Sequence, residues 1–378
     1  MRIVIITGIF PPDVGGPATY VPVVAQGLQN LGHQVTVITS SEPQHLTWDD
    51  AGYKFPVVRL NRRLSWALRT FYYQKQLAQY VGQCDVVYGH GLWWEVAQVC
   101  QKFNRPWVAK IVGDSTWERA VRRGWTKANL DEFQCPSFDI RIKLFRYWHN
   151  QAINQAKHVI VPSNYLAEII KKWGVNSNQI KVIYNAITLP GNISKLHNPL
   201  NTPYRVMTAG RLVPWKQIDE IITAITPLTD VGLLIVGNGS ERQKLEQQVQ
   251  DLCLENRVYF TGQKTQLELL ALMQTCDVFI LNSTYEGLPH IVLEAMSIGI
   301  PVVATAVGGT PEIIKDGITG RLIPPHAPDI LQLVIGELLQ QPELGQHYTR
   351  NAQELLTHFR TQTMIDQCAE VLHQVVGK

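Results

Sequence analysis

The sequence NSTYEGLPHIVLEAMSIGIPVVATAVGG, residues 282–309, decides the fold of the second half of the chain. It follows the apolar run 278–281, which has the character of a buried strand, and it leads into a helix expected to begin around Pro289. Gly287 has no side chain, so an anion can approach the backbone at the positive end of this helix. The stretch therefore predicts a phosphate site built from the backbone N–H groups of Gly287, Leu288, His290 and Ile291.

Two carboxylates flank this helix start, Glu286 just before it and Glu294 within it. Eight positions at about 1.5 Å rise each would put them roughly 12 Å apart along the helix axis. A carboxylate repels a phosphate, so useful acids here should accept hydrogen bonds from hydroxyl groups. A ligand with a diphosphate between two sugars would satisfy both features. Alternatively, Glu286 caps a helix and Glu294 is a solvated helix residue.

A Glu, seven residues and a second Glu in an EGLP context, followed by GIPVVAT and GG, resemble the donor-binding motif of retaining glycosyltransferases of family 4. That family, the glycosyl transferases group 1, has the GT-B fold. The resemblance implies that Glu286 contacts the donor sugar at the catalytic centre and that Glu294 binds the ribose hydroxyls of a nucleotide-sugar. It also implies an α/β fold with two Rossmann-like, doubly wound parallel-sheet domains that face a central cleft.

A pair of cations follows another strand. In GRLVPWKQID, Arg211 and Lys216 lie five positions apart with no acid between them. Arg binds a diphosphate as a fork and Lys as a point charge. This segment resembles the family motif whose Arg and Lys hold the pyrophosphate; the alternative is a pair of surface charges.

Three glycines complete the expected donor site. Gly15 and Gly16 lie in a loop before a helix, and in the family a matching loop faces the donor phosphate across the cleft. The alternative for this pair is a simple turn. Gly262 lies in VYFTGQKT, which in the family borders the nucleotide base chiefly through backbone atoms. GNGSER, which begins at Gly237, lacks the third glycine of a dinucleotide-binding motif, so we interpret it as a tight strand-to-helix turn.

Two residues in the first half are candidates for catalysis or acceptor binding. His90 follows the strand-like run 86–88, and ligands of open α/β sheets bind beyond the carboxyl ends of the strands. It could equally be a polar packing residue. Asp114 occupies a region where many family members have a histidine beside the reacting sugar. It either contacts the sugar or acceptor, as a base or hydroxyl acceptor, or caps a helix that begins near Ser115.

Composition limits the class of protein. The chain has 378 residues, 45% of them hydrophobic and 17% charged, which is typical of a globular protein large enough for two domains. The six cysteines lack paired metal-binding spacing, and the apolar start is too short for a signal peptide. We therefore expect a soluble cytoplasmic protein with free thiols, at most peripheral on the inner face of the plasma membrane.

Charge is divided unevenly between the halves. Residues 1–200 contain 22 Lys and Arg against 12 Asp and Glu, whereas residues 201–378 contain 12 against 19. Two basic stretches are rich in aromatic residues, RLNRRLSWALRTFYYQK at 59–75 and the segment 117–149. They suit an anionic membrane surface or a lipid-diphosphate acceptor, or they are solvated helix faces with aromatic residues in the core. No nucleic-acid-binding motif accompanies them, so we expect no nucleic-acid partner.

The expected domains follow from the pattern of strands and helices. Strand 1–10, helix 19–30 and strand 34–39 form one βαβ unit of an N-terminal, acceptor-binding Rossmann-like domain at 1–188. Residues 189–203, rich in Pro, Gly and Asn, form a linker. A second Rossmann-like domain at 204–361 binds the nucleotide-sugar. In GT-B proteins the last helix crosses back to the first domain, and residues 362–378 are expected to do so.

The function implied is transfer of a hexosyl group from a UDP- or GDP-sugar to an acceptor hydroxyl with retention, in polysaccharide, glycolipid or lipid-linked glycan synthesis. The acceptor would be a glycan or a lipid-linked molecule. The sequence contains no Asp-x-Asp motif, so we expect no metal and no cofactor. The alternatives are a nucleotide-sugar epimerase of GT-B architecture and a non-catalytic protein that binds sugar nucleotides.

Overall fold

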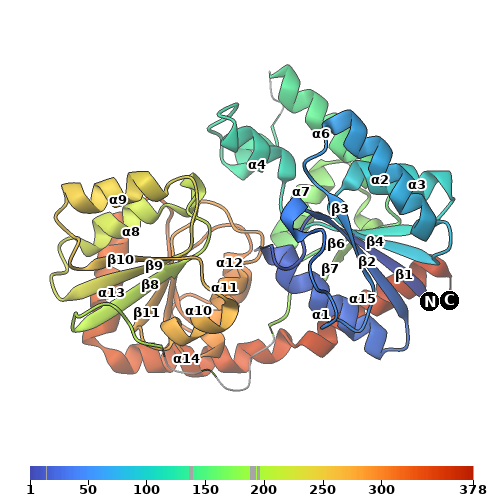
Figure 1. Ribbon diagram of the computed structural model, residues 1–378. Helices are drawn as coiled ribbons and strands as arrows, with labels where there is room; N and C mark the ends of the chain where they lie inside the picture. The colour runs from blue at the N-terminus through green and yellow to red at the C-terminus, as the bar shows by residue number, and fades with distance from the viewer. Residues whose placement is uncertain (14, 136–138, 188–192, 194–195, 378) are drawn as a thin grey trace. The chain divides into compact units, whose positions relative to one another are not determined.

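The computed structural model describes all residues except 14, 136–138, 188–192, 194–195 and 378, and omits the side chains of residues 66 and 67. The chain forms two compact units, Met1–Asn185 with Thr361–Lys378, and Ala186–Arg360. Each unit contains one parallel sheet with helices on both faces (Figure 1). The predicted fold class, two doubly wound α/β domains, is confirmed. Much of the expected linker, 189–192 and 194–195, lies outside the described residues.

The first unit contains a seven-stranded parallel sheet in the order β3-β2-β1-β4-β5-β6-β7. The order of the strands reverses between β1 and β4, which is the topological switch point of this sheet. The strands are β1 (Arg2–Thr7), β2 (Gln34–Ser41), β3 (Val57–Asn61), β4 (Val86–His90), β5 (Trp107–Lys110), β6 (His158–Val161) and β7 (Ile180–Val182).

Helices connect these strands in the alternating pattern expected from the sequence. They are α1 (Gly16–Asn30), α2 (Trp66–Val81), α3 (Trp93–Lys102), α4 (Ser115–Arg122), α5 (Leu130–Phe133), α6 (Ile140–Ile153) and α7 (Asn164–Lys172). The first helix begins three residues earlier than the expected start at Thr19. Gly15 takes the N-cap position and Pro17 the first turn, where a missing N–H costs nothing.

The C-terminal helix α15 (Thr361–Val376) packs on α1 and against β4 and β5. The contact with α1 is close because Gly27 has no side chain; a Cβ atom there would lie 2.2 Å from Ile365 Cδ1. Beneath this helix, Lys110 is fully buried and donates to the carbonyl of Ile183 at 3.1 Å. Burial lowers the pKa of Lys110 to about 8.

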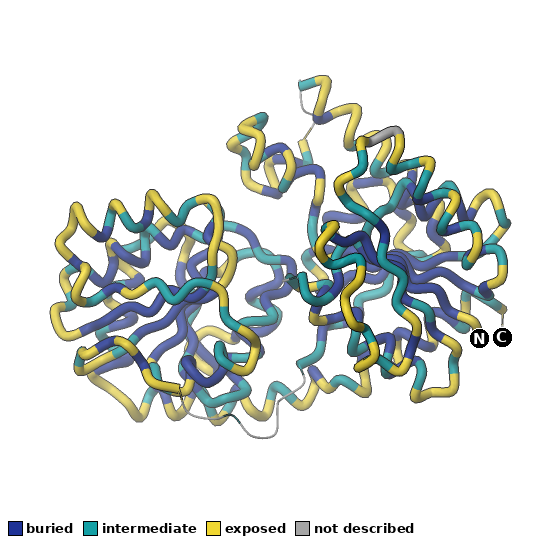
Figure 2. The backbone as a smooth tube through the Cα atoms, in the orientation of Figure 1, coloured by how far each residue is buried: buried dark blue, intermediate teal, exposed yellow. Residues whose placement is uncertain are grey.

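The second unit contains a six-stranded parallel sheet in the order β10-β9-β8-β11-β12-β13. Its strands are β8 (Tyr204–Ala209), β9 (Val231–Val236), β10 (Val258–Gly262), β11 (Val278–Leu281), β12 (Val302–Thr305) and β13 (Arg321–Ile323). Strands such as β9, VGLLIV, are buried at every position because helices cover both faces of the sheet (Figure 2).

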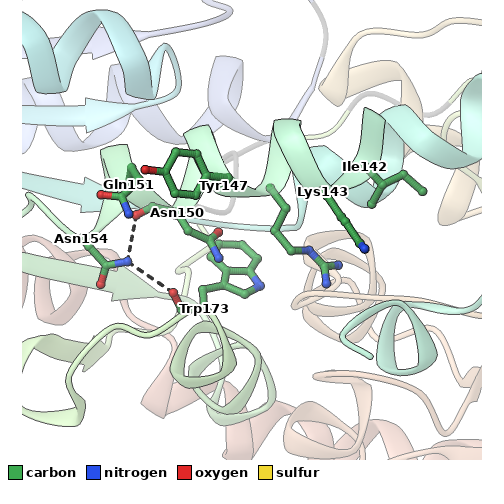
Figure 3. A pocket seen from close by; sticks show the side chains of 8 residues that line it. Ile142, Lys143, Tyr147, Asn150, Gln151, Asn154 and Trp173 are labelled. Atoms are coloured by element: carbon green, nitrogen blue, oxygen red, sulfur yellow. Dashed lines mark hydrogen bonds between the residues drawn. The ribbon is translucent and has the colours of Figure 1, made fainter. Parts of the chain in front are cut away.

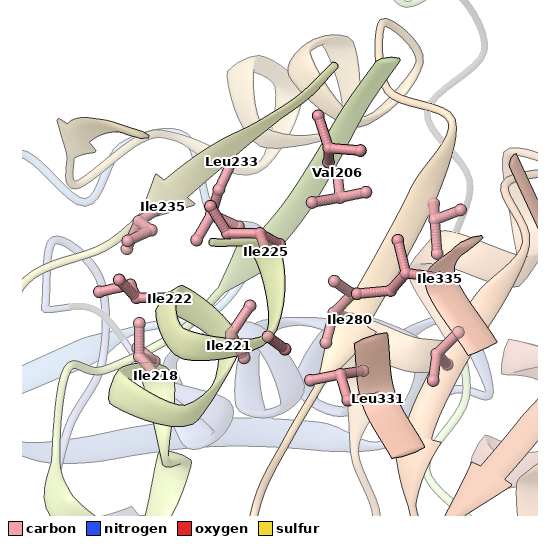
Figure 4. Close-up of a cluster of buried hydrophobic side chains, with 14 of the residues drawn as sticks. Val206, Ile218, Ile221, Ile222, Ile225, Leu233, Ile235, Ile280, Leu331 and Ile335 are labelled. Atoms are coloured by element: carbon pink, nitrogen blue, oxygen red, sulfur yellow. The ribbon is translucent and has the colours of Figure 1, made fainter. Parts of the chain in front are cut away.

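The helices of this unit are α8 (Ile218–Ile225), α9 (Arg242–Asp251), α10 (Gln266–Met273), α11 (His290–Ser297), α12 (Thr310–Ile313), α13 (Pro328–Gln340) and α14 (Pro342–Leu355). α8 and α9 lie on one face of the sheet, and α10 and α11 on the other (Figure 1). The core on the first face joins side chains of α8, α13 and the strands, among them Ile221, Leu233, Ile280 and Ile335 (Figure 4).

Candidate active site

The strand order of the second sheet reverses between β8 and β11. β8 continues into the loop that carries Arg211 and Lys216, and β11 continues into the loop that carries Glu286. Ligands of open α/β sheets bind where two such loops diverge, outside the carboxyl ends of the strands. The structure therefore brings three of the predicted donor-site residues to the switch point of one sheet.

Backbone hydrogen bonds tie these loops together. The N–H of Thr284 in the β11 loop donates to the carbonyl of Trp215 in the β8 loop at 2.8 Å, and the N–H of Gly309 donates to the carbonyl of Glu286 at 2.9 Å. A Cβ atom on Gly308 would lie 1.9 Å from the same carbonyl oxygen, and its φ of +56° is in the left-handed region. Only glycine fits this approach without strain.

A buried threonine provides a further support. The hydroxyl of Thr305, at the end of β12, accepts a hydrogen bond from the N–H of Ser283 at 2.9 Å and donates to the carbonyl of Ser283 at 2.6 Å. Its side chain has no solvent exposure. Ser283 is thereby fixed three residues before Glu286.

Glu286 is held by two side chains. Its Oε1 accepts from Lys216 Nζ at 2.5 Å and from Ser283 Oγ at 2.7 Å. The side chains of Lys216 and Glu286 are 18% and 12% exposed, so the pair is largely screened from water yet reachable. Within the described chain, Oε2 of Glu286 forms no hydrogen bond, which leaves this oxygen to accept from a hydroxyl group.

This ion pair is a contact of Lys216 that the sequence interpretation did not include, and the binding of a pyrophosphate by Lys216 stays a prediction. No acid lies between Arg211 and Lys216 in the sequence, but folding brings Glu286 to Lys216 from 70 residues away. The ammonium group therefore neutralises the carboxylate in the absence of ligand. A Lys at a partly buried position can bridge two anionic groups, because it has three donors and a flexible stem.

The loop with Arg211 is shaped by the glycines of GNGSER. A Cβ on Gly237 would lie 1.9 Å from the carbonyl oxygen of Gly210, and one on Gly239 would lie 2.2 Å from that of Leu212. The N–H of Leu212 donates to the carbonyl of Asn238 at 3.0 Å. These two glycines therefore let two backbone segments pack closely, as expected for a tight strand-to-helix turn. The guanidinium of Arg211 lies 5.9 Å from the ring centroid of Trp215.

Helix α11 begins at His290, with Pro289 as its N-cap. Pro289 makes no side-chain capping bond, and no acid occurs in the first turn of α11, so that turn has no charge that repels an anion. Pro289 has no N–H and therefore shapes the helix entry without donating. Residues 286–289 are not helical. The estimate of roughly 12 Å between Glu286 and Glu294 assumed a helical rise at every position, and this assumption is wrong.

Glu294 lies half-buried on α11 and accepts from Gln266 Nε2 at 2.8 Å. Burial raises its pKa, and the hydrogen bond from Gln266 opposes this only in part. Gln266 is the first residue of α10, four positions after Gly262. Gly262 has a φ of +73°, and its carbonyl accepts from the N–H of Gly237 at 2.9 Å. The predicted base-binding loop and the predicted ribose-binding acid therefore come from neighbouring segments.

The remaining predicted residues lie in the first unit. Gly15 caps α1, and Gly16 is the first residue of that helix. His90 ends β4 opposite Thr7 of β1, at the switch point of the first sheet, with its ring 5.4 Å from that of Tyr20. It is 5% exposed. The proposed contact of Gly15 and Gly16 with a donor phosphate stays a prediction.

Asp114 is the N-cap of α4. Its Oδ1 accepts from the N–H groups of Thr116 and Trp117, each at 2.9 Å, and its Oδ2 accepts from Gln134 Nε2 at 3.3 Å. It is 1% exposed. The structure thus shows the capping role that was the alternative for this residue. A catalytic role for Asp114 stays a prediction.

Sequence reasoning assigned no role to Ser283, Thr305 or Gln266. Ser283 could have been suspected as a hydroxyl at the end of a strand just before Glu286, whereas Thr305 and Gln266 gave no local signal. Among the described residues, no group of three or more His, Cys, Asp or Glu side chains is arranged to hold a metal ion. In the same part of the chain, no helix is both long and apolar enough to span a bilayer.

Two family models match both halves of the chain. The model of Glycosyltransferase Family 4 matches residues 14–189, and that of Glycosyl transferases group 1 matches residues 192–355. An uncharacterized glycosyltransferase of Methanocaldococcus jannaschii is 25% identical over 61% of this chain; the alignment spans 63% of that protein, less than two thirds of its length. Glycogen synthase of Mycobacterium tuberculosis is 26% identical over 98% of this chain and 94% of its own.

Among solved structures, HepE of Anabaena in complex with UDP-glucose is similar with a TM-score of 0.80 and 24% identity. The match covers 99% of this chain and 100% of HepE. At this level of identity the likeness establishes the fold, which is GT-B. The fold predicted from the resemblance is therefore confirmed.

Replacing Glu294 with Gln should separate stability from ligand binding. A carboxyl whose pKa is raised by folding stabilises the protein below its unfolded pKa and loses this contribution as pH rises through the folded pKa. Glu294→Gln should therefore raise the melting temperature at pH 7 but not at pH 4. It should weaken UDP binding by about tenfold, because a charge-assisted hydrogen bond is lost.

Differential scanning fluorimetry at both pH values and calorimetric titration with UDP would measure these effects. Glu255→Gln, at an exposed position of the same unit, is the control and should change neither quantity. Equal stability of Glu294→Gln and wild type at pH 7, together with unchanged UDP affinity, would contradict the assignment.

Proposed function

Because this chain belongs to the family 4 glycosyltransferases, the glycosyl transferases group 1, we propose that it transfers a hexosyl group from a nucleotide-sugar to an acceptor hydroxyl with retention at the anomeric carbon. The observation that carries this proposal is the Lys216–Glu286 pair at the switch point of the second sheet. The donor would be a UDP- or GDP-sugar. HepE was solved with UDP-glucose, which makes UDP-sugars the first donors to try.

The diphosphate of the donor would lie between the two cations and the start of α11. Arg211 can bind two of its oxygens with the two arms of its guanidinium. Lys216 can loosen its contact with Glu286 and donate to a phosphate oxygen. The N–H groups at the start of α11 add fixed positive charge. Together these groups would stabilise the negative charge that develops on the leaving nucleoside diphosphate.

The two acids would hold the sugars on either side of that diphosphate. Glu286, oriented through Oε1, can accept from a hydroxyl of the transferred sugar through Oε2. Glu294 would accept from the ribose hydroxyls, with Gln266 orienting it and the Gly262 loop beside the base. Such oriented acceptors favour one position of the anomeric carbon.

In the proposed reaction the acceptor oxygen bonds to the anomeric carbon on the face from which the phosphate departs. The bond between that carbon and the phosphate oxygen breaks, and the acceptor proton passes to the same phosphate oxygen. The step therefore needs no separate base to remove the acceptor proton. We propose His90 as a contact of the acceptor or donor sugar, and Asp114 as a residue that acts by fixing the start of α4.

Removing the ammonium group of Lys216 should impair catalysis far more than stability. Lys216→Ala should lower kcat/KM for donor turnover on the order of 10²-fold, because a donor to the developing charge is lost. Glu286→Gln should lower turnover similarly while the protein stays folded, because the amide oxygen of Gln can still accept from Lys216 and Ser283.

Donor hydrolysis or transfer assays, with circular dichroism as a check of folding, would measure both variants. Lys244→Ala is the matched control, because this lysine is 72% exposed on α9 in the same unit. Turnover near that of wild type in Lys216→Ala would show that the site lies elsewhere.

We also propose that the reaction requires no metal. Arg211, Lys216 and the amides of α11 supply the positive charge for which other transferases use a divalent ion. Turnover measured in excess chelator should equal that in buffer alone. Loss of turnover with chelator, restored by magnesium, is the contrary outcome.

An anionic membrane is the proposed site of action. α2 and α6 both contact α3, and neither α2 nor α6 contains an Asp or Glu. Phe71 on α2 is 75% exposed, and Ile140, Leu144 and Trp148 follow each other at four-residue spacing on α6 with 73%, 55% and 47% exposure. Exposed apolar rows flanked by Arg and Lys are typical of helices that lie on anionic lipid. This surface would bring the enzyme to a lipid-linked acceptor.

Flotation with vesicles tests this proposal. The wild type should float with phosphatidylglycerol vesicles and less with neutral ones, and binding should fall as salt rises. Leu144→Glu combined with Phe71→Glu should abolish flotation, whereas Leu333→Glu, at a position 70% exposed in the second unit, should not. Flotation that is equally poor with both lipid compositions would remove the membrane from the proposal.

The alternatives are distinguishable by their products. An epimerase of GT-B architecture would change the sugar of the donor and would transfer no sugar to an acceptor. A non-catalytic protein would bind UDP or GDP sugars without turnover. The paired acids and cations favour transfer, because they hold both halves of a sugar nucleotide and leave the anomeric carbon to react.

A further inference from the structure

A groove on the first unit has a chemistry that the donor site does not explain. It encloses about 390 Å³ beside α6, within the range of about 300–1,000 Å³ that is typical of small-molecule sites. Trp173, the C-cap of α7, closes it on one side (Figure 3). Every other residue that lines it comes from α6 or from Asn154, which directly follows that helix.

The lining follows two rows of four-residue spacing, which on a helix lie side by side. The inner row contains Ile142, Arg146 and Asn150 and faces the body of the unit. The outer row contains Lys143, Tyr147 and Gln151 on successive turns (Figure 3). The apolar row of Ile140, Leu144 and Trp148, proposed above to contact lipid, is a third and separate row.

The outer row offers donors that the protein does not use. Within the described chain, the ammonium of Lys143, the hydroxyl of Tyr147 and the side-chain amide of Gln151 form no hydrogen bond or ion pair. Asn154 differs, because its amide already donates to the carbonyls of Asn150 and Trp173. The groove therefore presents a cation, a phenol and an amide in order along one helix.

The inner row adds a fixed cation. The guanidinium of Arg146 lies 4.4 Å from the ring centroid of Phe133 and donates to the carbonyl of that residue. Its Nε is buried and has no hydrogen-bond partner among the described residues. The ring and the carbonyl of Phe133 therefore hold the guanidinium in place beside the groove.

The base of the groove connects to the carboxyl end of β5. Trp173 is 5% exposed, and its indole Nε1 donates to Gln134 Oε1 at 2.9 Å. Gln134 in turn donates to Asp114, the cap of α4. Trp173 is thereby fixed in orientation, and its ring offers a flat apolar wall of the kind that packs against sugar rings.

We propose that this groove binds a phosphorylated saccharide, the acceptor of the proposed transfer. The phosphate would lie between Lys143 and Arg146, and the sugar hydroxyls would meet Tyr147 and Gln151. Two cations three positions apart, on adjacent turns of one helix, suit a phosphate. A phenol and an amide suit hydroxyls, which both donate and accept. The assignment of this ligand as acceptor rests on the proposed function, but its binding does not.

Binding can be measured with the donor site already filled. UDP-saturated protein would be titrated with glucose 6-phosphate, glucose and inorganic phosphate by calorimetry. Glucose 6-phosphate should bind more tightly than either of the other two. Lys143→Glu should weaken glucose 6-phosphate at least tenfold, whereas Lys157→Glu, at an exposed lysine beyond the end of α6, should leave it unchanged.

A second variant tests the sugar contact. Gln151→Ala should weaken glucose 6-phosphate several-fold and leave inorganic phosphate unaffected. No binding of glucose 6-phosphate to the wild type, equal binding to Lys143→Glu, or equal affinity for glucose 6-phosphate and inorganic phosphate would each overturn the proposal. So would binding of phosphatidic acid vesicles through Lys143 without binding of the sugar phosphate.

The affinity of each variant for UDP keeps the two proposals apart. If UDP binds and glucose 6-phosphate does not, the groove is wrong and the donor site stands. If neither UDP nor GDP binds the wild type, the proposed function is wrong, and titration of the nucleotide-free protein still tests the groove.

Discussion

The reversal of strand order between β8 and β11 is the constraint on which the proposed donor site depends. At that point the loops of two adjacent strands leave the sheet in opposite directions, so their backbone groups cannot all pair with each other. One loop contributes cations and the other contributes an acid and a helix start. Three backbone hydrogen bonds, from Thr284 to Trp215, Gly309 to Glu286 and Leu212 to Asn238, connect these loops with each other and with neighbouring loops.

A local sequence signal predicted part of this arrangement. The end of β11, Gly287 and the start of α11 could be read from the sequence because a strand, a glycine and a helix-starting proline lie within a dozen residues. The contact of Lys216 with Glu286 could not, because 70 residues separate the partners and no local pattern encodes a pairing across two strands. The same holds for Gln266 and Glu294, which are 28 apart. The alternation of strands and helices could be predicted from the sequence pattern, and the GT-B fold from the family resemblance. The side-chain contacts of the two acids depend on how the chain folds and could not be predicted.

Asp114 illustrates a different limit of sequence reasoning. A carboxylate directly after a strand fits both a catalytic base and a helix cap, and the two roles need the same residue type. Only the structure shows that both oxygens already accept hydrogen bonds, from two backbone N–H groups and from Gln134. A carboxylate so occupied and 1% exposed has little capacity to take a proton from an acceptor. This favours a reaction in which the leaving phosphate takes that proton.

The two acids of the donor site raise an electrostatic problem, since carboxylates repel the diphosphate that the cations attract. The structure offers a solution for each. Glu286 forms an ion pair with Lys216, a residue of the β8 loop, and this pairing reduces its negative charge. Glu294 is half-buried with a raised pKa, so its negative charge is less favoured than that of an acid in water. Each acid keeps an oxygen for hydroxyl groups while its charge is reduced by pairing or by burial. A site built in this way can bind the two sugars of a donor without losing its attraction for the anion between them.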